Sequence, residues 1–193
     1  MPGAVMFCAA WERRYEADAM KRALLLLAAS LFAGSLVLRA QGPVPRPAPE
    51  LRIVQASGST TLLSSYRGRV VLLAFISTQC VHCQAASRVF EQFAREFSGR
   101  LQVAEVAFDD HADTGAFTKR FGLTFPVGSG SSDAAHAFLG VPAGMRVGTP
   151  QVVAVDQRGV IRAQSERLGT PMLQTPEFLR SLLNAMFKLE AAR

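Results

Sequence analysis

Residues 69–83 read RVVLLAFISTQCVHC, a run of apolar and β-branched residues that ends in two cysteines three positions apart. The unbroken apolar run predicts a strand that is covered on both faces. Beyond it, apolar residues recur at helical spacing as far as Phe97, and Gly99 then stops the pattern, which predicts a helix. The two cysteines are therefore expected at a strand-to-helix junction.

This position gives the two thiols different roles. Cysteines three residues apart in the first turn of a helix lie close enough to form a disulfide. The unpaired N–H groups and the dipole of the helix start can stabilise a thiolate on Cys80. Cys80 is the expected nucleophile, and Cys83 is the expected resolving thiol.

A cysteine pair can also bind zinc or form a static disulfide. A zinc site needs more ligands, but the only other cysteine is Cys8, and His111 and His136 are isolated in the sequence. A static disulfide across so short a loop stabilises a fold weakly. The pattern therefore favours a redox-active pair, with no metal and no cofactor beyond the two cysteines.

The size and charge of the chain indicate how many domains it forms and which partners it can bind. Its 193 residues suit one domain once the N-terminal region is set aside, and the formal net charge is +6. The basic residues are spread along the chain and do not form a patch interleaved with aromatic residues. A nucleic-acid partner is therefore not expected.

The first 40 residues are typical of an export signal. Lys21 and Arg22 precede an apolar stretch at 23–38, which is short for a membrane-spanning helix. Leu38 is large for its place before a cleavage site, so an uncleaved membrane anchor stays open. Met20 suits the start of such a signal better than Met1, and translation from Met20 would remove Cys8. We expect a periplasmic or secreted protein, and anchoring to the inner membrane by this segment is the alternative to a cleaved signal.

The remaining chain divides into a proline-rich tether at 41–49 and a domain at 50–193. Within the domain the pattern predicts a hairpin at 51–54 and 60–63, and a strand at 101–108 that pairs parallel with the apolar strand before the cysteines. It predicts a helix at 115–121 capped by Thr114 and a helix at 134–139 capped by Ser132 or Asp133. A second hairpin is expected at 151–156 and 160–163, and a closing helix after Thr175-Pro176. This order predicts an α/β fold with a mixed sheet and helices on both faces.

With these motifs in this order, the chain resembles the thioredoxin superfamily, and within it the exported TlpA/ResA-like proteins related to AhpC/TSA. The resemblance covers about 50–188. It is carried by the Cys80–Cys83 motif, Tyr66-Arg67-Gly68, Phe125-Pro126-Val127 and Thr149-Pro150 before the later hairpin. It implies a thioredoxin-like fold with an N-terminal β-hairpin and a central insertion.

The resemblance also implies site residues. It places a cis Thr149-Pro150 bond beside the cysteines, with Thr149 offering backbone groups to a substrate peptide. This chain has Gln79 where a tryptophan is common and Ala74 where a buried acid is common. Glu105 on the next strand is a candidate substitute for that acid, and a solvated Glu105 is the alternative.

His82 lies inside the motif at the position that a histidine occupies in the strongly oxidising DsbA proteins. Its imidazole would lower the pKa of Cys80 and make the disulfide more oxidising. The alternative is a solvent-directed His82 with little influence on Cys80.

The function that this resemblance implies is an extracytoplasmic thiol-disulfide oxidoreductase. Its partners would be protein thiols or disulfides and a membrane or periplasmic redox protein. As a reductant it would serve cytochrome c maturation or copper-site assembly, and as an oxidant it would introduce disulfides.

Two other functions stay open. A peroxiredoxin-like peroxidase shares the fold and the Phe-Pro-Val segment, and Ser77 stands three residues before Cys80. A copper metallochaperone of the Sco type uses two thiols and a distant histidine, for which His111 and His136 are the candidates.

Overall fold

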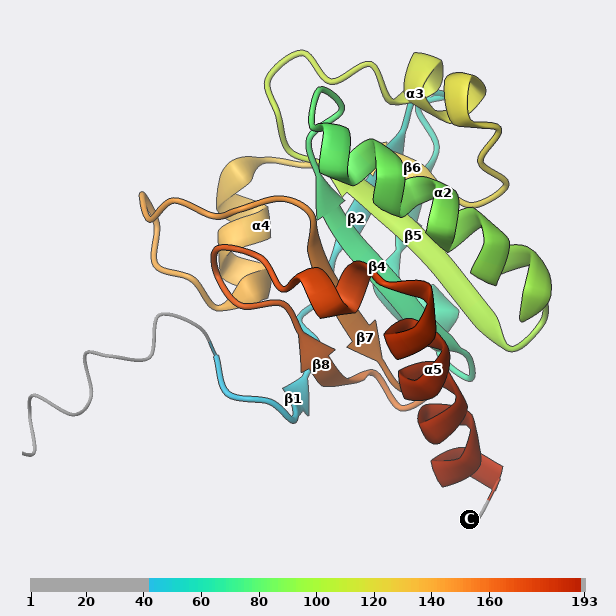
Figure 1. Cartoon of the computed structure of the whole chain (residues 1–193). Coiled ribbons are helices and arrows are strands. Elements are labelled where there is room, and N and C mark those ends of the chain that lie inside the picture. Colours follow the sequence, from blue (N-terminus) through green and yellow to red (C-terminus); the bar gives the residue numbers. More distant parts are fainter. Residues whose placement is uncertain (1–41, 192–193) are drawn as a thin grey trace, which may run out of the picture. The chain divides into compact units, whose positions relative to one another are not determined.

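A computed structural model describes residues 42–191, and the side chains of residues 190 and 191 are left undescribed. These residues form one mixed sheet in the strand order β1-β8-β7-β4-β5-β6-β2-β3, with helices packed against it (Figure 1). The strands are β1 Arg46–Pro47, β2 Arg52–Gln55, β3 Thr60–Leu62, β4 Val70–Ile76, β5 Leu101–Ala107, β6 Val127–Ser129, β7 Gln151–Val155 and β8 Val160–Gln164. The helices are η1 Leu63–Tyr66, α2 Val81–Glu96, α3 Thr114–Phe121, α4 Ser132–Leu139, η2 Pro171–Gln174 and α5 Pro176–Ala191.

The apolar run that leads to the cysteines forms the centre of the sheet. All seven residues of β4 are buried, and β4 pairs parallel with β5 and antiparallel with β7. Helix α2 makes the crossover between β4 and β5, as the sequence predicts. The later hairpin is also confirmed, because β7 and β8 pair antiparallel. The α/β fold expected from the sequence is therefore correct.

Helices cover both faces of this sheet. On one face α2 and α5 pack against the even-numbered residues of β4, with Phe90, Phe93, Leu179 and Leu183 in the buried cluster. On the other face α4 packs against the odd-numbered residues, where the rings of Phe75 and Phe138 lie 5.3 Å apart. The side chains on the two faces of β4 therefore pack into two separate parts of the core.

Two helix caps differ from the sequence prediction. Helix α3 is capped by Asp113, whose side chain accepts from the Ala116 N–H, and not by Thr114. Helix α4 is capped by Ser131, which accepts from the Ala134 N–H, and not by Ser132 or Asp133. Neighbouring residues here share the same capping chemistry, so only the backbone conformation decides which one caps.

The proline-rich segment does more than separate the domain from the N-terminal region. Its residues Arg46 and Pro47 form β1, which pairs antiparallel with β8, and the Val44–Pro45 bond is cis. The Arg46 guanidinium also donates to the Phe138 carbonyl at 2.9 Å and to Gln164 at 2.6 Å. The sheet therefore begins before Glu50, the expected start of the domain.

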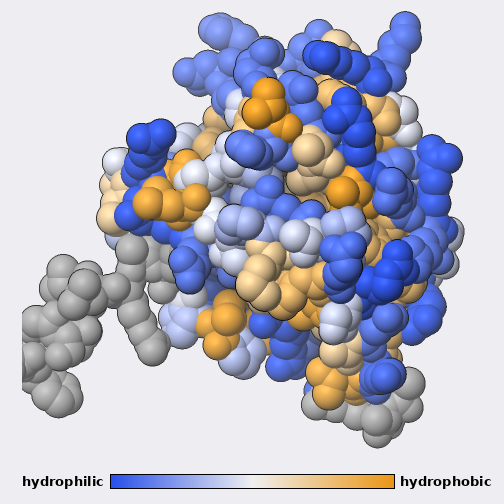
Figure 2. Space-filling view, in the orientation of Figure 1, coloured by the Kyte–Doolittle hydropathy of each residue, from blue (hydrophilic) through white to orange (hydrophobic). Residues whose placement is uncertain are grey.

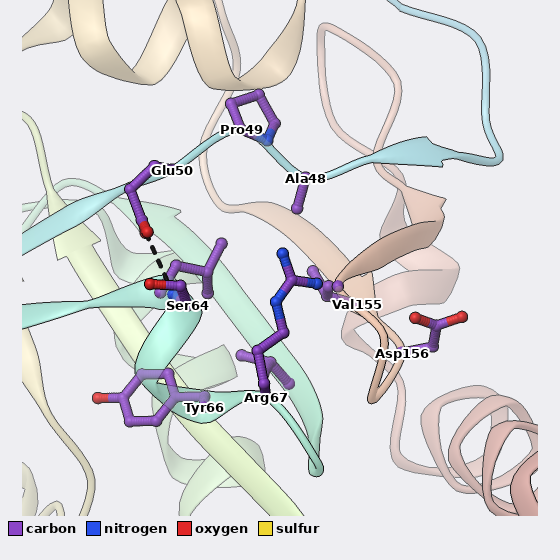
Figure 3. Close-up of a pocket in the computed structure, with 11 residues that line it drawn as sticks. Ala48, Pro49, Glu50, Ser64, Tyr66, Arg67, Val155 and Asp156 are labelled. Carbon is purple, nitrogen blue, oxygen red and sulfur yellow. Dashed lines mark hydrogen bonds between the residues drawn. The ribbon is translucent and has the colours of Figure 1, made fainter.

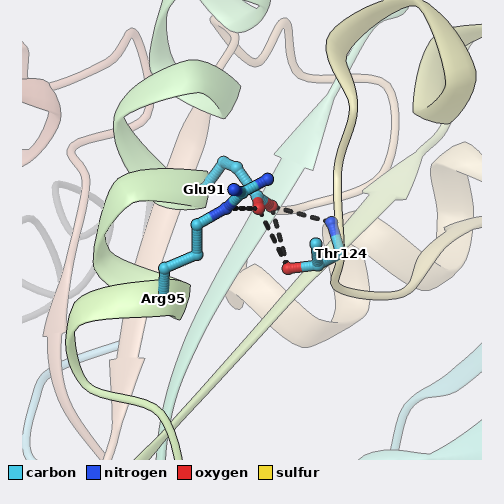
Figure 4. A network of polar contacts seen from close by, with 3 residues as sticks. All are labelled: Glu91, Arg95 and Thr124. Atoms are coloured by element: carbon cyan, nitrogen blue, oxygen red, sulfur yellow. Dashed lines mark hydrogen bonds and ion pairs between the residues drawn. The ribbon is translucent and has the colours of Figure 1, made fainter.

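One buried carboxylate fixes α2 to the segment before β6. Glu91 accepts from the backbone N–H of Thr124 at 2.7 Å and from its hydroxyl at 3.0 Å, while Arg95 donates to the same carboxylate (Figure 4). Burial raises the pKa of Glu91, but these donors outweigh burial and hold it below its ordinary value. The carboxylate is thus a structural anchor.

A cavity of about 80 Å³ lies near the start of β4, between η1 and the C-terminal end of β7. Figure 3 shows the Arg67 side chain extending between Ala48 and Val155, while Glu50 accepts from the Ser64 N–H at 3.1 Å. The cysteines follow the other end of β4. This cavity is therefore not part of the cysteine site.

No helix within the described residues is long and apolar enough to cross a membrane. The expected export signal, the start at Met20 and Cys8 all lie outside those residues.

Candidate active site

The cysteine pair lies where the sequence predicts it, at the start of α2. Cys80 is the N-cap residue, with an extended backbone (φ −78°, ψ 119°), and its Sγ accepts from the Cys83 N–H at 3.3 Å. A cysteine side chain thus does the work that a serine or aspartate usually does at a helix start. Both cysteines are free thiols in the structure.

Their environments differ sharply. Partial burial raises the pKa of the Cys80 thiol, but contacts with the Cys83 thiol, Thr149 and the N–H groups of Cys83 and His82 outweigh this, and the pKa falls below its ordinary value. Cys83 is fully buried, and burial together with the neighbouring Cys80 raises its pKa to about 12. Cys80 is therefore the thiol that ionises first, and Cys83 stays protonated.

Thr149 and Pro150 lie beside Cys80, although they are far from it in the sequence. The Thr149–Pro150 bond is cis, as the resemblance implies, and the Cys80 Sγ lies 3.6 Å from the Thr149 carbonyl oxygen. Thr149 is half-buried and Pro150 is buried. The structure thus brings together the two cysteines and this pair, while the substrate-binding role of Thr149 stays a prediction.

His82 is exposed, and its backbone N–H contributes to the lowered pKa of Cys80. Tuning of Cys80 by the imidazole therefore stays a prediction.

The other two histidines lie apart from the cysteines. His111 is exposed, with φ 62°. Both ring nitrogens of His136 lie 2.7 Å from backbone carbonyl oxygens, those of Ser132 and Met145. Among the described residues no three His, Cys, Asp or Glu side chains are grouped as metal ligands.

Several residues that the sequence analysis did not single out hold the site in place. The amide of Gln151 lies within bonding distance of the carbonyl oxygens of Gly148 (2.8 Å), Glu166 (2.9 Å) and Arg167 (3.1 Å). It therefore ties the segment before Pro150 to the loop after β8. A glutamine at the head of an otherwise apolar strand was the available signal in the sequence.

A second set of hydrogen bonds fixes the loop before Cys80. Asp109, at the end of β5, accepts from the Thr78 N–H at 3.1 Å and from its hydroxyl at 2.7 Å. The Gln84 amide donates to the Thr78 carbonyl at 3.0 Å. The end of β5 thus positions the residues that lead into the helix start. A carboxylate directly after a buried strand was the signal in the sequence.

Glu105 is fully buried on β5, which excludes the solvated alternative. Burial raises its pKa to about 8, and a hydrogen bond from Ser87 opposes this rise. That Glu105 takes the place of the acid missing at Ala74 stays a prediction.

These elements define a thioredoxin-like protein with a cysteine pair at a helix start and a cis-proline beside it. The AhpC/TSA family model matches residues 44–164, and the chain belongs to this family. This confirms the resemblance to the thioredoxin superfamily and to its AhpC/TSA-related proteins, while the TlpA/ResA-like assignment stays a prediction. A comparison with curated proteins gives no match.

Solved structures with the same fold include three that illustrate its range. A proposed protein disulfide isomerase from Bacteroides thetaiotaomicron is 26% identical, with a TM-score of 0.59, over 77% of this chain and 94% of that one. A thiol:disulfide interchange protein of the thioredoxin family from Chlorobium tepidum TLS is 19% identical, with a TM-score of 0.59, over 74% and 99%. Peroxidoxin BcpB from Mycobacterium tuberculosis is 16% identical, with a TM-score of 0.61, over 74% and 96%. The chain is therefore an oxidoreductase of the thioredoxin-like type.

Proposed function

We propose that this protein is an extracytoplasmic thiol-disulfide oxidoreductase that exchanges disulfides with partner proteins through Cys80 and Cys83. The observation that carries the proposal is the difference between the two thiols. Cys80 is accessible at a helix start with a lowered pKa, and Cys83 is fully buried behind it with a raised pKa. Such a pair suits an attack followed by an intramolecular resolution.

The reaction runs in two exchanges. The Cys80 thiolate attacks one sulfur of a partner disulfide, forms a mixed disulfide and releases the other partner sulfur as a thiolate. Cys83 then loses its proton and attacks the Cys80 sulfur. The Cys80–Cys83 disulfide forms, and the second partner thiolate leaves. Two electrons pass from the chain to the partner, and the reverse sequence oxidises a partner dithiol.

The surface around Cys80 supports a protein partner. Val81 is 69% exposed next to Cys80, and Leu168 is 65% exposed in the loop whose Arg167 carbonyl accepts from the Gly148 N–H at 2.8 Å. Figure 2 shows hydrophilic residues over most of the viewed face, with apolar patches set between them. Exposed apolar side chains beside a reactive thiol favour an apolar peptide segment over a small polar thiol.

Matched serine variants test this proposal. With Cys83→Ser, we expect Cys80 to accumulate a stable mixed disulfide with oxidised glutathione or with a peptide disulfide, detected by mass spectrometry. With Cys80→Ser, we expect no such adduct, because Cys83 is buried and protonated. Cys8 is replaced by alanine in both variants, so that only the pair is tested. Equal labelling of the two variants would contradict the assigned roles. Peroxide consumption by the reduced wild type that outpaces disulfide exchange would favour the peroxidase instead.

The direction of electron flow is tested by the reduction potential of the pair. Family values run from about −270 mV for thioredoxin to about −120 mV for DsbA. A potential near the first value supports a reductant, and a potential near the second supports an oxidant. Comparison with His82→Ala measures what the exposed imidazole contributes.

Export rests on the charged and apolar pattern at residues 21–38. Expression of the full chain followed by cell fractionation should place it outside the cytoplasm, either cleaved or held at the membrane. Retention of the uncleaved chain in the cytoplasmic fraction would overturn this part of the proposal.

A further inference from the structure

Five basic residues that are scattered in the sequence gather at one end of the sheet, and together they form the basic end of the domain. They are Arg67, Arg69, Arg100, Arg158 and Lys188. The first two precede β4, the third precedes β5, the fourth lies in the turn between β7 and β8, and the last lies in the final turn of α5. Because β5 runs parallel to β4 and β7 runs antiparallel to it, this end is opposite to the one where Cys80 follows β4. Four of the five residues are exposed, and Arg69 is half-buried.

Hydrogen bonds bring the approach to β4 against the turn between β7 and β8. Gly68, which separates the two arginines before β4, donates its N–H to the Gln157 carbonyl at 3.0 Å. The Arg67 guanidinium also donates to the Arg158 carbonyl. The basic residues of these two segments are therefore neighbours.

The start of β5 and the last turn of α5 lie beside them. The Val70 N–H donates to the Arg100 carbonyl at 3.2 Å, which places Arg100 next to the residues before β4. The guanidinium carbon of Arg100 lies 4.1 Å from the centre of the Phe187 ring, and Phe187 immediately precedes Lys188. The five basic residues thus cover one continuous part of the surface.

The acidic side chains described near this end are engaged with other groups. Asp156 pairs with Arg162 at 2.7 Å, and Glu96 pairs with Arg180. Glu50 accepts from backbone N–H groups on η1 and on its own neighbour. Within the described part of the chain none of the five basic residues forms an ion pair. The field at this end is therefore positive, and it favours a negatively charged partner.

An exposed apolar side chain lies at the same end. Leu189 follows Lys188 on α5 and is 60% exposed. Figure 2 shows apolar and hydrophilic residues side by side at the lower end of the view, where α5 ends in Figure 1. Basic residues beside an exposed apolar side chain suit the interface of an anionic membrane, because lipid headgroups take the charge and the acyl boundary takes the leucine. A nucleic acid would use the basic residues but not the leucine.

We propose that the basic end binds the surface of an anionic phospholipid membrane, with Leu189 inserted among the headgroups. Cys80 then faces away from the membrane, because it follows the opposite end of β4. This orientation keeps the reactive thiol open to protein partners while the domain stays at the membrane. Stable attachment takes two signals, and the apolar stretch at 23–38 would be the other one. The inference goes beyond the proposed thiol chemistry and does not depend on it.

Sedimentation of the full chain with lipid vesicles tests the binding. The apolar stretch at 23–38 can bind any lipid, so the quantity to measure is the gain in affinity when phosphatidylglycerol is added to phosphatidylcholine vesicles. We expect a gain of at least about tenfold at low salt that shrinks at high salt. Arg158→Gln combined with Lys188→Gln should reduce this gain at least about fivefold. The matched control is Lys119→Gln combined with Arg120→Gln on α3, which removes the same charge from another part of the surface and should leave the gain unchanged.

Tryptophan probes test the orientation of the bound domain. Trp11 is the only tryptophan of the chain, so Trp11→Phe supplies a background without one. In this background Leu189→Trp should shift its fluorescence to shorter wavelength on anionic vesicles, and brominated lipid should quench it. Val81→Trp, an exposed position beside Cys80, should show neither effect.

Several outcomes would overturn the inference. Wild-type protein that gains nothing from phosphatidylglycerol would do so, and so would an equal loss of the gain in the two double variants, which would mean that only net charge matters. Quenching of Val81→Trp as strong as that of Leu189→Trp would overturn the orientation. Binding of a single-stranded DNA oligonucleotide as tight as that of the anionic vesicles would overturn the assignment to lipid. All of these outcomes are independent of disulfide exchange, so they leave the proposed function to its own test.

Discussion

Glu91 on α2 and Glu105, which faces α2 from β5, are both buried, yet their pKa values shift in opposite directions. Glu91 is 8% exposed and receives hydrogen bonds from Thr124 and Arg95, and its pKa lies below the ordinary value. Glu105 is 0% exposed and has one hydroxyl partner, and its pKa is raised to about 8. The number of donors, rather than burial alone, decides whether the pKa of a buried carboxyl group is lowered or raised.

The largest effect that this comparison predicts is on the pH dependence of stability. The folded-state pKa of Glu105 is raised above its unfolded value of about 4.3, so its contribution is fully present below that pH and is lost as the pH rises through about 8. Glu105→Gln removes this loss. The free energy of unfolding of the variant, relative to the wild type, should therefore increase between these limits by up to about 5 kcal/mol. Urea unfolding of both proteins at a series of pH values measures it.

The quantity to follow is the difference in unfolding free energy between Glu105→Gln and the wild type. His136 also has a raised pKa, through its two carbonyl partners, and so adds a pH dependence of its own to each protein. Its contribution is likewise lost as the pH rises, but it is common to both proteins and cancels. A difference that stays flat from acid to mildly alkaline pH would contradict the raised pKa of Glu105.

Glu91→Ala should act with the opposite sign. Because the folded-state pKa of Glu91 is lowered, its contribution is present above the unfolded pKa and is lost as the pH falls through the folded one. At neutral pH the loss of the bonds to Thr124 should destabilise the fold by about 1–3 kcal/mol. Unfolding at neutral and at acid pH checks this, and we expect the destabilisation to shrink in acid. An equal loss at both would show that packing, and not the charge, is what Glu91 provides.

Ser87→Ala should produce a smaller change. It removes the hydroxyl between Glu105 and the Cys83 carbonyl, so we expect a loss of about 0.5–1.5 kcal/mol. Because the Ser87 bond lowers the pKa of Glu105, its removal should raise that pKa further. NMR titration of the Glu105 carboxyl carbon reads this shift directly. A shift downward would mean that Ser87 does not donate to the carboxylate.

Arg95→Ala should have the smallest effect. The Arg95 side chain is 67% exposed, so its ion pair with Glu91 is screened by solvent and should contribute about 0.3–0.5 kcal/mol. Stability measured at low and high salt should differ less in this variant than in the wild type. A loss as large as that of Glu91→Ala would mean that Arg95 and not Thr124 anchors the carboxylate.

Local pattern was enough to find most of the fold and the centre of the site. The apolar run of β4, the cysteines at the start of α2 and Thr149-Pro150 before β7 each carry their signal within a few residues. The face on which Glu105 lies was not readable in this way. Strand β5 is covered on both sides, so its sequence alternates only at Leu101, Gln102 and Val103 and then turns apolar, which does not tell on which face Glu105 lies.

The features that the sequence did not predict depend on contacts between distant segments. The Gln151 amide lies within bonding distance of three carbonyl oxygens from two loops, and Asp109, just after β5, accepts from the Thr78 N–H in the loop before Cys80. The sequence around Gln151 or Asp109 does not indicate which residues it will contact. The pairing of β1 with β8 was missed for a related reason, because prolines argue against a strand unless it lies at an edge.

That edge pairing has a consequence for the tendency of the protein to self-associate. An uncovered strand at the border of a sheet offers free backbone groups to other chains and promotes aggregation. Strand β1 covers the β8 border, and its Pro47 lacks the N–H that would allow another strand to add beyond it. A truncated protein beginning at Glu50 would lose this cover together with the Arg46 bonds to Phe138 and Gln164. The same chain beginning at Gln41 keeps its own border strand and should resist self-association.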